Sequence, residues 1–147
     1  MKKILSSIVA LLLVTPLAFA QKDLKCYPVF KGKIVPARQM VLTEVRGESM
    51  STYKLDYYRS VQFKVDEKKA LEVASLVKED SDAAPSAQTE ERGDLLTYAL
   101  IELSPIDKFR RYLCYQARQD GPFWVVTILY LEGSATLTDL RSMFEKQ

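Results

Sequence analysis

The sequence contains no histidine and no asparagine among its 147 residues. Without histidine it can form neither an HExxH zinc site nor the Ser-His and Cys-His pairs that activate nucleophiles. Without asparagine it offers no acceptor for N-glycosylation. We therefore predict no metal site, no cofactor and no catalytic residue, and we expect a protein that is not an enzyme.

Cysteine is also scarce, because Cys26 and Cys114 are the only two in the chain. They do not form a C-x-x-C motif, so a redox role is disfavoured. In an oxidising compartment an isolated pair is a candidate disulfide. It would close a loop of about 89 residues, which contributes about 4–5 kcal/mol in the chain-entropy model. The alternative is two free thiols.

The first 20 residues have the layout of a secretory signal peptide. A short basic start precedes the apolar stretch from Ile4 to Leu17, and Ala18-Phe19-Ala20 supplies the small residues of a cleavage site. We expect cleavage after Ala20 and a periplasmic or secreted product. Gln21, not cysteine, follows the site, so a lipoprotein is not expected. The remainder, residues 21–147, has the length of one domain.

The charge balance follows from this cleavage. Lys2 and Lys3 are two of the 21 basic residues, so residues 21–147 carry 19 basic and 19 acidic side chains. A neutral domain has no electrostatic attraction to nucleic acid or to an anionic membrane surface. No later segment is apolar enough to cross a membrane. The expected partner is therefore a protein or a component of the cell envelope.

A change of hydrophobic period at Asp66 defines the first half of the domain. Residues 53–65 alternate between apolar and polar, which predicts a strand buried on one side and paired in a hairpin with residues 40–46. Asp66 is a suitable N-cap for an amphipathic helix over residues 67–80. The flanking segments 21–37 and 81–94 lack a clear period, and we expect an irregular arm and a flexible loop.

The second half predicts three strands and a closing helix. The strands cover residues 95–103, 110–118 and 123–132, and a hairpin turn lies at residues 119–122. Thr136 and Asp139 form a capping box for the last helix. The fold class is thus α+β with the order β-β-α-β-β-β-α. We expect one antiparallel or mixed sheet of about five strands with both helices packed on one face.

The late strands are apolar on both faces, so one face needs cover from the arm, the loop, a partner or a second copy in a homodimer. Arg59 is the one charge on the inward face of the long strand, and it either pairs with a carboxylate such as Glu44 or marks an incompletely covered site. Together with Arg59, the candidate binding surface consists of five strand aromatics: Tyr98, Tyr112, Tyr115, Trp124 and Tyr130. Aromatics on strands also commonly form core pairs, and Trp124 is expected to be partly exposed.

Several sequence stretches carry a family resemblance. The ending Trp124–Gly133 followed by Thr136–Leu140, together with Tyr58–Val61 and the signal peptide, resembles small exported proteins of unknown function from Gram-negative anaerobic bacteria. This resemblance implies no activity. We expect a non-catalytic binding or interaction module of the cell envelope. The alternatives are a carbohydrate- or lipid-binding module that uses an aromatic sheet face, and a hydrolase that uses carboxylates or a Ser-Lys pair.

Overall fold

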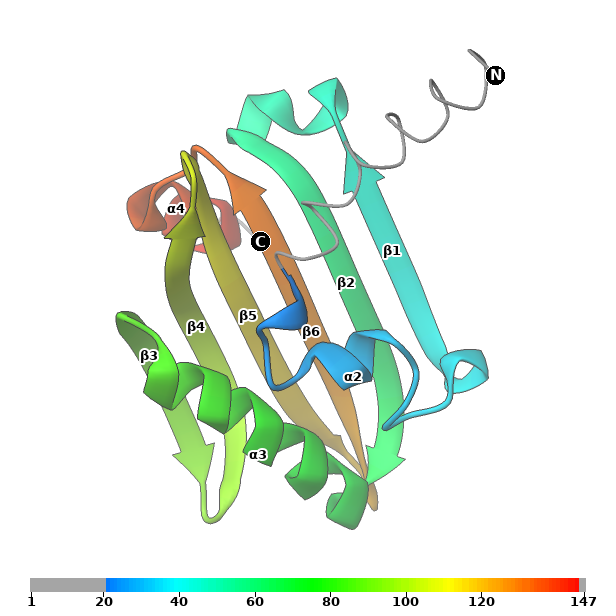
Figure 1. The fold of residues 1–147 in the computed structure, drawn as a ribbon. Helices are drawn as coiled ribbons and strands as arrows, with labels where there is room; N and C mark the ends of the chain where they lie inside the picture. Colours follow the sequence, from blue (N-terminus) through cyan, green and yellow to red (C-terminus); the bar gives the residue numbers. More distant parts are fainter. Residues whose placement is uncertain (1–20, 146–147) are drawn as a thin grey trace.

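A six-stranded antiparallel sheet runs through the molecule in the order β1-β2-β6-β5-β4-β3 (Figure 1). The structure is a computed structural model and describes residues 21–145, so the predicted signal peptide lies outside the described residues. The strands are β1 Met40–Arg46, β2 Leu55–Asp66, β3 Ser86–Arg92, β4 Leu95–Ile106, β5 Phe109–Asp120 and β6 Phe123–Gly133. The helices are α2 Tyr27–Phe30, α3 Glu67–Ala83 and α4 Leu137–Glu145, with short 3-10 turns η1 Ala37–Gln39 and η2 Glu48–Tyr53.

The two predicted hairpins are confirmed. β1 pairs with β2 from Met40 opposite Phe63 to Arg46 opposite Tyr57. β5 pairs with β6 as far as Asp120 opposite Phe123, around a turn in which Gly121 adopts a φ of 61°. A left-handed φ of this kind carries no steric penalty for glycine. The last strand then returns to the centre of the sheet and joins the two halves of the chain through the β2–β6 pairing.

The predicted helix starts are confirmed by their caps. The Lys69 N–H donates to the Asp66 side chain at 2.8 Å, which begins α3. At α4 the Asp139 N–H donates to Thr136 Oγ1 at 3.2 Å, and the Thr136 N–H donates to Asp139 Oδ2 at 2.8 Å. This reciprocal pair satisfies donors that the first helical turn leaves free.

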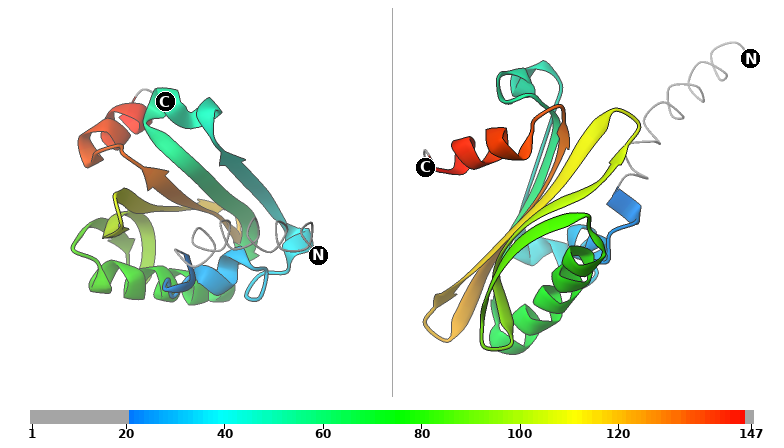
Figure 2. Two further views of the ribbon diagram at one scale, coloured as in Figure 1. Left: turned by 45° about the horizontal axis from the view of Figure 1, so that its top comes forward. Right: turned by 90° about the vertical axis from the view of Figure 1, so that its left-hand side faces the viewer.

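The helices lie on opposite faces of the sheet, so the prediction that both pack on one face is wrong (Figure 2). α2 and α3 cover one side, here called the α3 face, and α4 lies on the other, here called the α4 face. The chain changes side after Gly133, where the Lys54 carbonyl accepts the N–H groups of Ser134 and Ala135. The backbones approach closely there, because a Cβ on Gly133 would lie 2.7 Å from Leu55 Cα.

The sheet has six strands instead of about five, because part of the predicted loop 81–94 is a strand. β3 pairs along β4 from Ser86 opposite Glu102 to Arg92 opposite Leu95. Every residue of β3 is exposed, so the strand has no apolar alternation that a sequence pattern could reveal. Its strand conformation follows from its backbone pairing with β4.

Two hydrophobic clusters follow from this arrangement. The larger one lies on the α3 face and includes the α3 stripe Ala70, Val73, Ala74 and Val77. The smaller one lies under α4 around Leu55, Tyr112, Leu131 and Leu140. The predicted arm 21–37 contains α2 and contributes Leu24, Val29, Phe30 and Val35 to the larger cluster. No helix within residues 21–145 has the length and apolarity needed to span a membrane.

Candidate functional site

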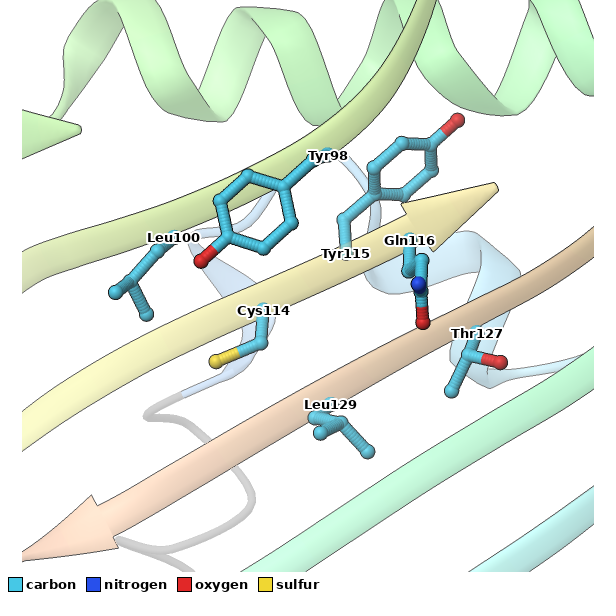
Figure 3. Close-up of a pocket in the computed structure, with 7 residues that line it drawn as sticks. All are labelled: Tyr98, Leu100, Cys114, Tyr115, Gln116, Thr127 and Leu129. Carbon is cyan, nitrogen blue, oxygen red and sulfur yellow. The ribbon is translucent and has the colours of Figure 1, made fainter. Parts of the chain in front are cut away.

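A pocket opens on the α4 face of the sheet, beside the region that α4 covers. Its volume is about 430 Å³, which lies within the range of small-molecule sites. Leu100, Cys114 and Leu129 lie at one register position on β4, β5 and β6 and line it side by side (Figure 3). The other lining residues are Tyr98, Tyr115, Gln116 and Thr127.

The pocket exists because α4 is too short to cover its whole face. The nine residues of α4 shield the end of the sheet where β6 finishes, and Leu140 packs there with Tyr112 and Leu131. The Tyr112 hydroxyl donates to the Ala135 carbonyl at 2.7 Å, which fixes the chain entering α4. Further along the strands, β4, β5 and β6 keep apolar side chains on this face although no described helix lies over them.

The side chains on this face change from apolar to polar along β5. Tyr112 is buried under α4, Cys114 lines the pocket, and Gln116 and Arg118 follow as exposed residues. The neighbouring antiparallel strand β6 shows the same change from apolar to polar, from Leu129 to Thr127. The pocket therefore has an apolar end next to α4 and a polar end that faces the β5–β6 turn.

The titratable groups in the pocket are neutral around pH 7. Burial raises the pKa of the Cys114 thiol to about 12, so the thiolate that would act as a nucleophile is scarcely populated. Burial also raises the pKa of the Tyr98 hydroxyl. Cys114 therefore lines the pocket as a small apolar side chain, and Tyr98 contributes an aromatic ring with one neutral hydroxyl group.

Most of the predicted aromatic surface lies elsewhere in the structure. Trp124, Tyr115 and Tyr130 belong to the core on the α3 face, and Trp124 is only 6% exposed, so the expectation that it is partly exposed is wrong. Tyr115 lines the pocket from β5, but its side chain belongs to the core on the α3 face. Its hydroxyl donates to the Leu96 carbonyl at 2.7 Å. Tyr98 alone of the five aromatics is part of the α4 face and partly exposed.

Arg59 lies on the α3 face and is therefore not part of the pocket. Its Nε lies 4.0 Å from Glu44 Oε2 across the hairpin, an ion pair without a hydrogen bond to Nε among the described residues, which agrees with the first of the two alternatives for this side chain. Its guanidinium also donates to the Gln21 side chain at 2.8 Å and to the Phe30 carbonyl at 3.3 Å. Arg59 thus holds the N-terminal arm against the sheet.

The predicted disulfide between Cys26 and Cys114 is wrong, because both cysteines are buried and free. Cys26 belongs to the cluster on the α3 face, whereas Cys114 belongs to the cluster on the α4 face. The sheet separates them. A spacing in sequence carries no information about the face on which each residue lies.

Buried charged groups hold the arm where a disulfide was expected. Asp80 on α3 accepts the backbone N–H of Lys25 at 2.7 Å and that of Cys26 at 3.0 Å. The buried Arg111 guanidinium binds both carboxylate oxygens of Asp23, at 3.1 and 3.0 Å. A bidentate pair of this geometry is among the stronger charged contacts in proteins.

A second polar group lies close to Arg111 on the same face. Glu132 is opposite Arg111 on the neighbouring strand, and its carboxylate accepts the Tyr130 hydroxyl at 2.6 Å. Burial raises the pKa of Glu132, although the hydroxyl and Arg111 both favour its charged form. The polar groups of Arg111, Glu132 and Tyr130 thus have partners within the chain. We assign this cluster to the attachment of the arm and not to ligand binding.

Sequence reasoning did not single out Leu100, Gln116, Thr127 and Leu129 as site residues. The signal that could have found them is the apolar character of both faces of the late strands, since one helix cannot cover two faces. The missing information was the position of α4, which decides how much of its face stays open.

Comparison with known proteins assigns the chain to a family. Residues 13–144 match a family of unknown function (DUF6108), so the chain belongs to that family. No curated protein and no solved structure matches it. The family description agrees with the resemblance to proteins of unknown function and names no activity.

Proposed function

We propose that the chain is an exported, non-catalytic binding module of the cell envelope that holds a small, partly apolar molecule on the α4 face of its sheet. The pocket lined by Leu100, Cys114 and Leu129 carries this proposal. Export rests on the sequence of residues 1–20, and a binding role without a reaction rests on the absence of histidine and on the neutral thiol in the pocket.

The lining favours an acyl or similarly lipid-like ligand over a carbohydrate. Sugars are commonly held by exposed aromatic faces, and Tyr98 is the only predicted aromatic that is partly exposed on this face. The apolar end of the pocket beside α4 suits a hydrocarbon group, and Gln116 and Thr127 offer hydrogen bonds to a polar end.

Displacement of the fluorescent probe 1-anilinonaphthalene-8-sulfonate tests this proposal. We expect fatty acids from octanoate to palmitate to displace the probe and neutral oligosaccharides not to displace it. Trp124 fluorescence is a poor readout, because this side chain is buried on the α3 face. Displacement by oligosaccharides alone would favour the carbohydrate alternative, and absence of probe binding would contradict the proposal.

A matched pair of variants locates the site. Leu129→Lys places a charge in the pocket, whereas Val125→Lys places the same charge on the same strand and face, outside the lining residues. Both side chains are half-buried. We expect Leu129→Lys to weaken fatty acid binding at least tenfold, or about 1.4 kcal/mol, and Val125→Lys to change it less than about twofold. Equal effects would place the ligand elsewhere.

A further inference from the structure

The two edges of the sheet differ in their exposed side chains. β3 presents Ser86-Ala87-Gln88-Thr89-Glu90-Glu91-Arg92, and its side chains are engaged by both neighbouring helices through Lys78–Glu91 at 2.8 Å and Arg141–Gln88 at 2.8 Å. Charged, engaged edges of this kind resist pairing with another chain. The β1 edge instead carries Val41 and Leu42, the two most exposed large apolar residues of the described chain, at 65% and 52%.

The backbone of β1 also offers free hydrogen-bonding groups. The Gly47 N–H donates to the Asp56 carbonyl at 3.2 Å, and this pair continues the β1–β2 register beyond Arg46 opposite Tyr57. Hydrogen-bonded and non-hydrogen-bonded pairs alternate in an antiparallel ladder. Val41, Thr43 and Val45 therefore direct their backbone groups toward β2. Leu42, Glu44 and Arg46 direct theirs to the outer edge, as does the Met40 carbonyl, whereas the Met40 N–H donates to the Ala37 carbonyl.

This edge is self-complementary about one residue. In an antiparallel pairing with Leu42 opposite Leu42 of the second copy, Met40 lies opposite Glu44 of the second copy. Leu42 and Glu44 direct both backbone groups outward, and Met40 directs its carbonyl outward. Both exposed apolar side chains then meet their counterparts, Leu42 directly and Val41 on the diagonal. The two Glu44 carboxylates lie on opposite sides of the two-fold axis, so their repulsion is small.

We infer that β1 pairs with β1 of a second copy of this chain, in the register centred on Leu42, to form a continuous sheet across a symmetric dimer. This interface is an edge and differs from the sheet-face dimer expected from the apolar late strands. It lies apart from the pocket beside α4. One paired strand per chain buries a small area, so the dimer is weak and depends on protein concentration.

Sedimentation of the purified protein over a concentration series tests the dimer. We expect the wild type to pass from monomer to dimer with rising concentration. Leu42→Lys should raise the dissociation constant at least tenfold, because it places two like charges at the axis. Leu71→Lys is the matched control, since it replaces an exposed leucine on α3 and should associate as the wild type does.

Cross-linking by oxidation tests the register. Leu42→Cys should form a covalent dimer, because hydrogen-bonded pairs place Cα atoms about 5.5 Å apart, within disulfide range. Arg46→Cys should react at least tenfold more slowly, since the two copies of residue 46 would be about 27 Å apart along the strands. The wild type serves as the control for the buried Cys26 and Cys114.

Three results would overturn the inference. They are a wild type that stays monomeric at every concentration, a dimer that Leu42→Lys leaves intact, and equal cross-linking at positions 42 and 46. The pocket variant Leu129→Lys should dimerise as the wild type does, so failure of the dimer and failure of the ligand proposal are separate outcomes.

Discussion

Replacing Asp80 by alanine should release the N-terminal arm from α3. The side chain is 6% exposed and accepts two backbone N–H groups, those of Lys25 and Cys26. In Asp80→Ala both donors lose their partner, and Cys26 is fully buried, so water cannot reach its N–H without movement of the arm.

The size of the effect follows from these two hydrogen bonds. A hydrogen bond to a charged group contributes about 1.5–3 kcal/mol, and two therefore contribute about 3–6 kcal/mol. Burial raises the pKa of Asp80, so the carboxylate is desolvated, and its removal recovers part of this free energy. We expect a net loss of about 2–4 kcal/mol in the free energy of unfolding.

Urea unfolding followed by Trp124 fluorescence measures this loss, because Trp124 lies in the core that the arm completes. Alkylation of Cys26 under native conditions measures the release itself. Cys26 should become reactive in the variant, while Cys114 on the other face should keep its wild-type rate. Asp82→Ala is the control, since Asp82 is exposed on the same helix and should change stability by less than about 0.5 kcal/mol.

The reasoning would be refuted by an Asp80→Ala protein as stable as the Asp82→Ala protein. It would equally be refuted by a stability loss without any gain in Cys26 reactivity, because the loss would then arise outside the arm.

Three further predictions concern other parts of the fold. Gly133→Ala should lower the free energy of unfolding by more than about 2 kcal/mol, because the added methyl group would collide with the Lys54 carbonyl and Leu55 Cα. Urea unfolding checks this, and an unchanged midpoint would contradict the close approach of the two strands. Burial raises the folded-state pKa of Glu132, so folding favours its protonated form. The wild type should therefore lose stability relative to Glu132→Gln as pH rises above about 4.5. Urea midpoints of both proteins from acid to neutral pH check this, and a difference that does not change with pH would argue against it. The intact mass of the protein should be the same with and without reductant, because Cys26 and Cys114 lie on opposite faces. A gain of two hydrogen atoms on reduction would contradict this placement.

The elements with a strong hydrophobic period could be predicted from the sequence. β2 alternates over most of its length and pairs with β1 as expected, and the starts of α3 and α4 follow from Asp66 and Thr136, whose capping is a local interaction. Such features depend on residues a few positions apart, and a single sequence contains all the information they need.

Features that depend on distant residues could not be predicted. β3 is exposed along its whole length and is a strand only because β4 pairs with it. The side of the sheet taken by α4 depends on how the chain turns after Gly133, and this turn decided the position of the pocket. The arm looked irregular because its partners, Asp80 and Arg111, lie 54 to 88 residues away.

The β2–β6 pairing has a consequence for the order of folding. Every other pair of neighbouring strands is joined by a hairpin, so β1–β2 and the β3–β6 meander can each form from nearby residues. The β2–β6 ladder joins residues as far apart as Leu55 and Gly133, and closing so long a loop costs chain entropy before any contact compensates for it. We therefore expect two partly folded halves to meet along this central ladder in the rate-limiting step. Substitutions at this seam should slow folding more than equally destabilising substitutions within either hairpin.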